Sequence, residues 1–281
     1  MAKLIATFDD SERQALAVRA RKQKPSGQPF PLTDLQRMVH FLRGVGTRAS
    51  MALPAFYFFI GATDRERSCS IEGYPGVVFL HSTEFSSCST ISLCCRKVFD
   101  HARGMTGNSF SRLSDLTLSE IATYWSKSSG RPVDDAARAL KLLRNVIREC
   151  SQSPTALLEG DGTVLGRRVA LLKQHADRVA AHLSLDNYEF SLMDVAHVVA
   201  ALAILGETVI SFDDASRGPQ FFNELDKASH DAAKALFPNL SEHRLFDGIA
   251  VSALAQRCWS EDPAYGARLI IDHLPYTTGW Y

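Results

Sequence analysis

Apolar residues recur along most of this chain at intervals of three and four positions, the spacing of helices that bury one face. The clearest stripe lies within residues 164–185 and consists of Leu165, Val169, Leu172, Ala176, Val179 and Leu183. No convincing run shows the alternation of apolar and polar residues that a half-buried strand requires. The pattern therefore predicts an all-α architecture.

Turn and capping signals divide this pattern into successive helices. The pair Gly44 and Gly46 is expected to end the second helix, whereas capping boxes at 117–120 and 191–194 are expected to begin two later ones. An aromatic block at 56–60 should be buried. The predicted helices cover residues 10–23, 33–43, 77–100, 117–127, 132–151, 164–185 and 191–206, with two or three more after residue 213.

These elements predict one helical core with an addition at each end. An N-terminal helix and linker occupy residues 1–31, a helical bundle forms the core over 32–212, and a helical extension at 213–281 packs on that core. The helix that starts at Ser191 is apolar on nearly all sides, so it should be central. The apolar run at 51–62 has twelve residues, fewer than the roughly 20 needed to cross a bilayer. We therefore expect no membrane segment.

Charge and cysteine content narrow the function classes. Lys plus Arg and Asp plus Glu each number 31, so no global field draws the chain to nucleic acid, and any basic site must be local. Six cysteines show no C-x-x-C pair and no zinc-like spacing, which favours reduced thiols in a cytoplasm. The adjacent Cys94 and Cys95 could be redox-active. Helical spacing instead favours core packing for Cys88, Ile91, Cys95 and Phe99.

The strongest chemical signal is a basic edge beside the apolar stripe of 164–185. At about 100° per residue, Arg168, His175 and His182 lie within about 40° of one another, and Arg178 lies roughly a fifth of a turn away. This edge borders the core, so it is either the active edge of an enzyme or the solvated side of a helix. A zinc site is excluded, because His175 and His182 stand two turns apart, about 10.5 Å along the axis.

Other candidate side chains favour structural roles. His197 lies on the apolar helix, where a buried, hydrogen-bonded imidazole is expected and a functional role is the alternative. Asp100 ends a helix and should accept hydrogen bonds from neighbouring backbone amides, while His101 and Arg103 in the following loop should be solvated. Residues 160–163 form a turn and helix cap without the Lys and spacing of a phosphate-binding loop.

Three segments in a fixed order resemble a known family. They are CCRKVFDHARG at 94–104, the capped helix after residues 108–110, and ADRVAAH at 176–182, which the helix from Ser191 follows. Over residues 77–212 the chain resembles HEPN-type proteins, more narrowly the AbiU2-like group associated with abortive phage infection. The resemblance implies a HEPN-like antiparallel helical bundle with additional N- and C-terminal helices. It also implies a ribonuclease toxin or an RNA-binding module.

The resemblance further implies a metal-independent reaction without a cofactor. In active members a histidine and an arginine, separated by four to six residues, lie beside the same pair from a second subunit. Imidazole exchanges the proton of a 2′-hydroxyl, and guanidinium neutralises charge on the phosphorus oxygens. Here His182 would be the acid/base, Arg178 the phosphate clamp, His175 a second proton-transfer group, and Arg168 a further RNA-binding residue. The implied partners are a second copy of the chain, RNA, and an antitoxin or other protein.

An inactive relative is the alternative. Only three residues separate Arg178 from His182, and Ala176 or Asp177 stands where the family's arginine would fall. In that case the same helix face binds RNA or a partner protein without cleavage.

Overall fold

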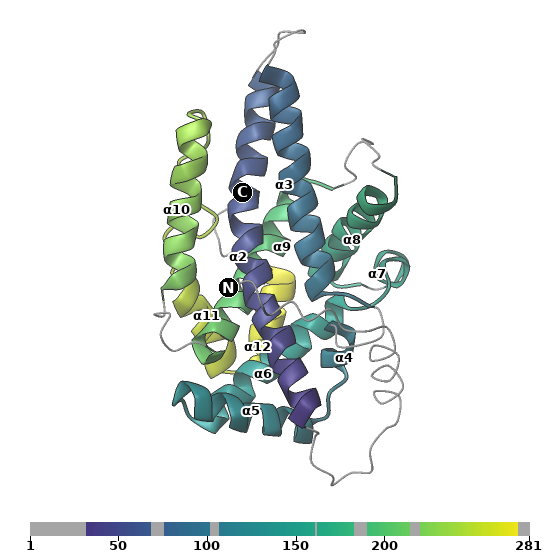
Figure 1. The fold of residues 1–281 in the computed structure, drawn as a ribbon, viewed down its shortest axis with the longest axis vertical. Coiled ribbons are helices and arrows are strands. Elements are labelled where there is room, and N and C mark those ends of the chain that lie inside the picture. The colour runs from purple at the N-terminus through teal and green to yellow at the C-terminus, as the bar shows by residue number, and fades with distance from the viewer. Residues whose placement is uncertain are drawn as a thin grey trace.

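The computed structural model describes residues 32–68, 76–101, 107–160, 162–182, 190–213 and 220–274. Every regular element in these ranges is a helix, which confirms the all-α prediction. The helix expected at 10–23 lies outside them. Figure 1 shows α2 and α3 side by side along the long axis, with α10 and α8 on opposite sides of this pair.

Helix α2 (Leu32–Ser68) is one helix of 37 residues, so the predicted end at Gly44 and Gly46 is wrong. Gly46 faces α9, since a Cβ placed on it would lie 3.5 Å from the Ile210 side chain. A glycine inside a helix costs about 1 kcal/mol relative to alanine. Packing outweighs that cost, because the helix buries a long apolar face that includes Val45, Ala49, Ala52, Leu53, Phe56 and Tyr57. This face contains part of the aromatic block that the sequence predicts to be buried.

Helix α3 (Gly76–Val98) nearly matches its prediction and packs against α2. The four residues expected on its buried face, Cys88, Ile91, Cys95 and Phe99, are fully buried. Burial raises the pKa of the Cys95 thiol to about 12, so it stays protonated near neutral pH. The core-packing interpretation of these cysteines is therefore confirmed.

The middle of the chain forms α4 (Gly107–Ser111), α5 (Asp115–Ser129), α6 (Val133–Cys150), α7 (Pro154–Glu159), α8 (Val164–His182) and α9 (Leu192–Asp213). The N-cap of α5 is Ser114, whose Oγ accepts a hydrogen bond from the Thr117 N–H. The capping box predicted at 117–120 is therefore not the start of the helix, since it lies about one turn inside it. The predicted box before α9 is confirmed: Ser191 N–H donates to the Asp194 carboxylate at 2.7 Å, and Asp194 N–H donates back to Ser191 Oγ at 3.3 Å. Helix α7 occupies the predicted loop before α8.

Helix α9 is the centre of the fold. It is buried on all sides from Val195 to Ile210 and continues to Asp213, seven residues beyond its predicted end at Gly206. By length and composition it could cross a membrane, but 94% of its most apolar window is buried inside the protein. Its predicted central position is confirmed.

The C-terminal elements are α10 (Phe221–Leu236), α11 (Val251–Ser260), α12 (Pro263–Arg268) and a π-helix (Leu269–His273). Helix α10 packs on α2, α11 on α9 and α6, and α12 on α6. Trp259 is buried with its ring 5.3 Å from the ring of Phe212, which itself stacks on Trp125 at 5.5 Å. The apolar interior is continuous from α2 to the π-helix.

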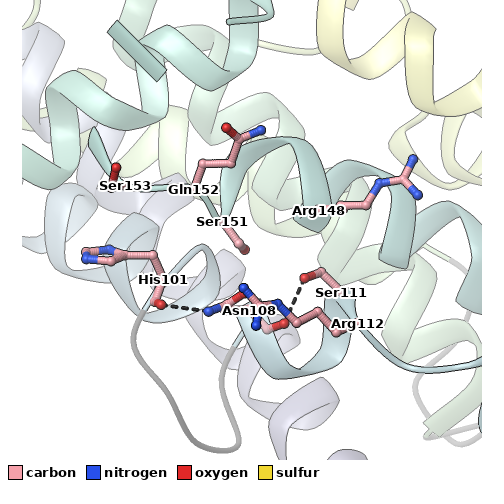
Figure 2. Close-up of a pocket in the computed structure, with 8 residues that line it drawn as sticks. All are labelled: His101, Asn108, Ser111, Arg112, Arg148, Ser151, Gln152 and Ser153. Atoms are coloured by element: carbon pink, nitrogen blue, oxygen red, sulfur yellow. Dashed lines mark hydrogen bonds between the residues drawn. The ribbon is translucent and has the colours of Figure 1, made fainter. Parts of the chain in front are cut away.

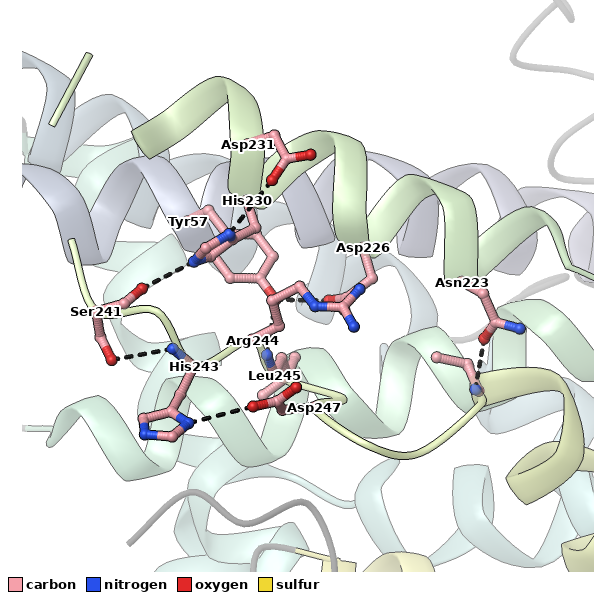
Figure 3. Close-up of polar contacts among 11 residues, drawn as sticks. Tyr57, Asn223, Asp226, His230, Asp231, Ser241, His243, Arg244, Leu245 and Asp247 are labelled. Atoms are coloured by element: carbon pink, nitrogen blue, oxygen red, sulfur yellow. Dashed lines mark hydrogen bonds and ion pairs between the residues drawn. The ribbon is translucent and has the colours of Figure 1, made fainter. Parts of the chain in front are cut away.

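A buried polar network attaches the segment after α10 to α2 (Figure 3). The Tyr57 hydroxyl donates to Asp226 at 2.6 Å and accepts the Leu245 N–H at 2.7 Å. His230 donates to the Ser241 carbonyl at 2.8 Å, and Arg244 lies 3.6 Å from the Asp226 carboxylate. Burial raises the pKa of both Tyr57 and Asp226. Because each of these groups has a partner, the network holds the segment in place.

A second buried carboxyl, Glu207, connects α9 to the first turn of α10. One of its oxygens accepts the Phe222 N–H at 3.4 Å, and the other is buried without a hydrogen-bond partner among the described residues. Burial raises the pKa of Glu207 to about 7, an effect that the Phe222 N–H and the Arg131 charge oppose. The folded state therefore holds a proton on Glu207 at mildly acidic pH.

The Glu207 proton makes stability depend on pH. In the unfolded chain this carboxyl titrates near pH 4.5. The stabilisation of the fold by the bound proton is therefore complete below that pH, and it is lost as the pH rises through about 7, the pKa of Glu207 in the folded state. The variant Glu207→Gln resembles the protonated form. It should be more stable than the wild type at pH 9 by roughly 1–3 kcal/mol, and about equal near pH 4. Urea unfolding followed by circular dichroism measures the difference.

The control is Glu224→Gln on the exposed side of α10, which should change stability by less than about 0.5 kcal/mol at every pH. A Glu207→Gln variant that is less stable than the wild type at pH 9 would show that the charged carboxylate stabilises the fold.

Candidate functional site

A polar pocket of about 500 Å³ lies where the end of α3, helix α4 and the end of α6 meet (Figure 2). We call it the α3 pocket and define it by its eight lining residues: His101, Asn108, Ser111, Arg112, Arg148, Ser151, Gln152 and Ser153. They come from three segments that are separated in the sequence. Its volume lies within the range of about 300–1,000 Å³ that is usual for small-ligand sites.

The end of α3 is held by α4. Phe99 is fully buried and anchors the turn that follows the helix. Asn108 donates a hydrogen bond to each of the two residues in that turn, Asp100 and His101. Its backbone N–H donates to the Asp100 carbonyl at 3.0 Å, and its side-chain amide donates to the His101 carbonyl at 2.7 Å. The His101 backbone is therefore fixed, while its imidazole stays exposed at the pocket (Figure 2).

A glycine brings α4 close to α3 and α6. A Cβ at Gly107 would lie 2.2 Å from the Val98 carbonyl oxygen, 3.0 Å from Ser151 Oγ and 3.1 Å from Ile147. Real Cβ atoms do not approach a carbonyl oxygen this closely. The pocket wall therefore requires a residue without a side chain at this position.

The pocket carries an excess of positive charge. Arg112 and Arg148 contribute guanidinium groups. Among the described residues, the one ion pair that either of them forms is a contact of 3.4 Å between Arg148 and its partly buried neighbour Glu149. None of the eight lining residues is acidic. Guanidinium groups bind carboxylate and phosphate oxygens in a bidentate manner. An anion is therefore the ligand that this lining fits.

Lys173 of α8 lies behind the pocket wall. Only 2% of this residue is exposed, and its ammonium donates to the carbonyl oxygens of Cys150 and Gln152 at 2.5 and 3.3 Å. Burial lowers the pKa of Lys173, and the nearby Asp100 carboxylate raises it in part. The lysine therefore ties the end of α6 to α8 and fixes the segment that carries Ser151 and Gln152.

Arg168, expected on a basic edge that binds RNA, is part of an internal network. Its guanidinium lies 2.9 Å from the Asp194 carboxylate and donates to His197 Nδ1 at 2.7 Å. His197 is buried, and its other ring nitrogen donates to the Ile270 carbonyl in the π-helix at 2.7 Å. Burial lowers the pKa of His197 to about 4, so the ring is neutral. The predicted buried, hydrogen-bonded imidazole is confirmed.

The other sequence-predicted residues lie further along α8. His175 is partly buried, with its ring edge-on to Phe190 at 5.5 Å. The side chains of Arg178 and His182 lie outside the described residues, as does Arg103. The roles of Arg178 and His182 therefore remain predictions.

Two of the three segments that carry the family resemblance, 94–104 and 176–182, lie next to each other. Helix α3 packs against α8, and Arg96 near the end of α3 forms an ion pair with Asp177, the neighbour of Arg178. Within the described residues, no three His, Cys, Asp or Glu side chains gather closely enough to hold a metal ion.

His101 and Arg96 carry a signal that the sequence interpretation misses. His101 is exposed, as expected of a solvated residue, and it also lines the α3 pocket. Four residues separate it from Arg96, which is the spacing that the family resemblance implies for an active pair and that Arg178 and His182 lack. No such local signal exists for Arg112 and Arg148, because only the fold brings their segments together.

Comparison with known proteins assigns no family: no family model, curated protein or solved structure matches the chain. The functional inference therefore depends on the chemistry of the α3 pocket and on the motif resemblance.

The approach of α4 can be tested at Gly107. The variant Gly107→Ala should lower the free energy of unfolding by about 1–3 kcal/mol, because its methyl group overlaps the Val98 carbonyl. Gly44→Ala is the matched control. No atom lies within 4 Å of a Cβ at Gly44, so this variant should be stabilised by up to about 1 kcal/mol. Urea unfolding of both variants provides the measurement, and equal stability of Gly107→Ala and the wild type would rule out the close approach.

Proposed function

We propose that this chain is an RNA-binding protein of the HEPN type that cleaves RNA without a metal, as a toxin of phage defence, and that the α3 pocket is its site. The observation that carries the proposal is the composition of the pocket. One imidazole, two guanidinium groups and several neutral hydrogen-bonding side chains surround about 500 Å³, with no acidic side chain in the lining.

This lining suits a phosphodiester. A phosphodiester group carries one negative charge, and its oxygens only accept hydrogen bonds. Arg112 and Arg148 supply charged donors in a planar arrangement, and Asn108 and Gln152 add neutral polar groups at the pocket. A net charge of zero over the whole chain is compatible with this ligand, since only a local basic site is needed.

In this proposal, His101 acts on the sugar beside that phosphate. Its imidazole would take the proton of a ribose 2′-hydroxyl as the 2′-oxygen forms a bond to phosphorus and the bond from phosphorus to the 5′-oxygen breaks. The leaving 5′-oxygen takes a proton from a second acid. The arginines stabilise the charge that develops on the phosphorus oxygens. Imidazole is the side chain most often used for proton transfer near neutral pH.

The second acid has two candidate sources. Helix α8, which packs on α3, carries His175 and His182, and the latter is the acid/base predicted from the sequence. A homodimer, as the resemblance implies, would instead bring a second copy of His101. The ion pair between Arg96 and Asp177 supports placing both family segments in one functional region.

RNA binding without cleavage is the second candidate. It is favoured by one observation, that His101 is the only imidazole among the eight lining residues, whereas transfer in both directions needs two proton-transfer groups. In this form the chain binds RNA, or an antitoxin or other protein partner, through the same pocket.

The test is cleavage of a mixed RNA pool by purified protein in excess chelator. His101→Ala should lower the rate by about 100-fold or more, the usual contribution of one acid/base group. His182→Ala decides whether α8 supplies the second group. Arg112→Ala and Arg148→Ala should each weaken RNA binding by about tenfold. His243→Ala, at an exposed histidine in the segment after α10, is the matched control and should cleave at the wild-type rate.

Helicity and oligomeric state are compared for all variants, so that loss of fold is not mistaken for loss of chemistry. Tight, arginine-dependent binding without cleavage would select the second candidate. Unchanged cleavage in His101→Ala together with unchanged binding in both arginine variants would refute the α3 pocket as the site.

A further inference from the structure

One hydroxyl in the α3 pocket differs from the others. Ser111 donates its hydroxyl to the Asn108 carbonyl at 2.8 Å, and Ser153 Oγ accepts the Ala156 N–H at 3.2 Å. Ser151 is 5% exposed, and its Oγ is buried without a hydrogen-bond partner among the described residues. Figure 2 shows Ser151 between Gln152 and Asn108, at the inner wall of the pocket.

An unpartnered buried hydroxyl costs about 1–3 kcal/mol, so its presence calls for a reason. The backbone does not require it: Ser151 ends α6 with φ −92° and ψ 16°, a conformation open to alanine. The surrounding fold does not use it as a cap, since Lys173 already bonds the carbonyl groups on both sides of Ser151. The remaining explanation is a ligand group that this hydroxyl would bind.

The chemistry of that group follows from what the other lining residues provide. Phosphate oxygens accept hydrogen bonds, and Arg112 and Arg148 already supply charged donors for them. A serine hydroxyl both donates and accepts, so its best partner is a group that does the same. In a nucleic acid the ribose 2′-hydroxyl is such a group, and DNA lacks it.

The pocket also lacks a platform for a base. The one aromatic ring among the eight lining residues is the His101 imidazole, which is the proton-transfer group of the proposed function. Base recognition in single-stranded RNA usually relies on stacking against aromatic rings or guanidinium planes. The arginines here are the phosphate ligands of the proposal. Sugar and phosphate are therefore the parts of a nucleotide that this pocket fits.

We infer that Ser151 binds a ribose 2′-hydroxyl, and that the α3 pocket therefore selects RNA over DNA without preference for the base. This inference rests on the proposed function, because it assumes that a phosphodiester lies on Arg112 and Arg148. In the structure the Oγ of Ser151 is buried, so ligand binding requires the serine to change its χ1 rotamer and turn the hydroxyl toward the pocket.

The experiment compares oligouridine RNA with oligodeoxyuridine DNA, which differ only in the 2′-hydroxyl, by fluorescence anisotropy in chelator, with RNA integrity checked on a gel. The wild type should bind RNA about tenfold more tightly than DNA. Ser151→Ala should lose about fivefold to tenfold in RNA affinity and keep its DNA affinity. Ser128→Ala is the matched control, since Ser128 lies outside the pocket lining and its hydroxyl donates to the Trp125 carbonyl, and it should keep the wild-type ratio of the two affinities.

Stability provides a second readout. Because the Ser151 hydroxyl has no hydrogen-bond partner in the part of the chain that the structure describes, Ser151→Ala should be at least as stable as the wild type in urea. A clear loss of stability would mean that the hydroxyl has a structural role, and this would overturn the inference. An unchanged affinity ratio in Ser151→Ala, or an equal change in Ser128→Ala, would do the same.

Base preference is measured with oligoadenosine and oligocytidine in place of oligouridine. Affinities within about threefold of one another are expected, and a preference above tenfold would overturn the inference. Failure of the proposed function has a different signature: Arg112→Ala and Arg148→Ala would then leave the binding of RNA and DNA unchanged. A wild type that requires both arginines but binds RNA and DNA equally would keep the proposed function and reject the role of Ser151.

Discussion

The arrangement of the helices is determined mainly by one constraint, that α9 must be covered on all sides. Its residues from Val195 to Ile210 are buried whichever way they face, so water must be excluded from its whole circumference. Burying apolar surface contributes about 25 cal/mol per Å², and one helix can cover only one side of another. Helices from every part of the described chain therefore contact α9, from α2 near the N-terminus to α11 near the C-terminus. The positions of α3 and α6, and so of the pocket between their ends, follow from this enclosure.

The same constraint explains why α2 does not break where its glycines suggest. Close approach between α2 and α9 requires small residues on both helices: a Cβ on Gly206 would lie 2.5 Å from Ala49, and Gly46 faces Ile210. In a helix that must cover α9, glycine acts as a contact residue and not as a stop signal. A sequence taken alone shows the flexibility of glycine, but it does not show which partner helix will lie against it.

Local signals in the sequence therefore predicted local structure well and predicted assembly poorly. The apolar stripe of α8, the Ser191 cap and the apolar circumference of α9 each lie within one segment. The structure confirms the cap, the circumference and the described part of the stripe, from Leu165 to Ala176. The α3 pocket joins residues 101, 108–112 and 148–153, and nothing in any one of these segments indicates the others. Arg168 shows the converse: its helical position predicted an accessible basic edge, whereas its guanidinium pairs with Asp194 and His197 on the next helix.

The electrostatic character of the pocket depends on which backbone carbonyl groups around it are already hydrogen-bonded. The C-terminal ends of α3 and α6 would present carbonyl oxygens, and the negative ends of two helix dipoles would disfavour an anion. Asn108 bonds the carbonyls of Asp100 and His101, and Lys173 bonds those of Cys150 and Gln152. With these four acceptors occupied, the charged groups in the lining itself are the guanidinium groups of Arg112 and Arg148. Hydrogen bonds to these carbonyl groups thus remove the acceptors that would oppose an anion where the two helices end, which is the condition for the phosphate site that we propose.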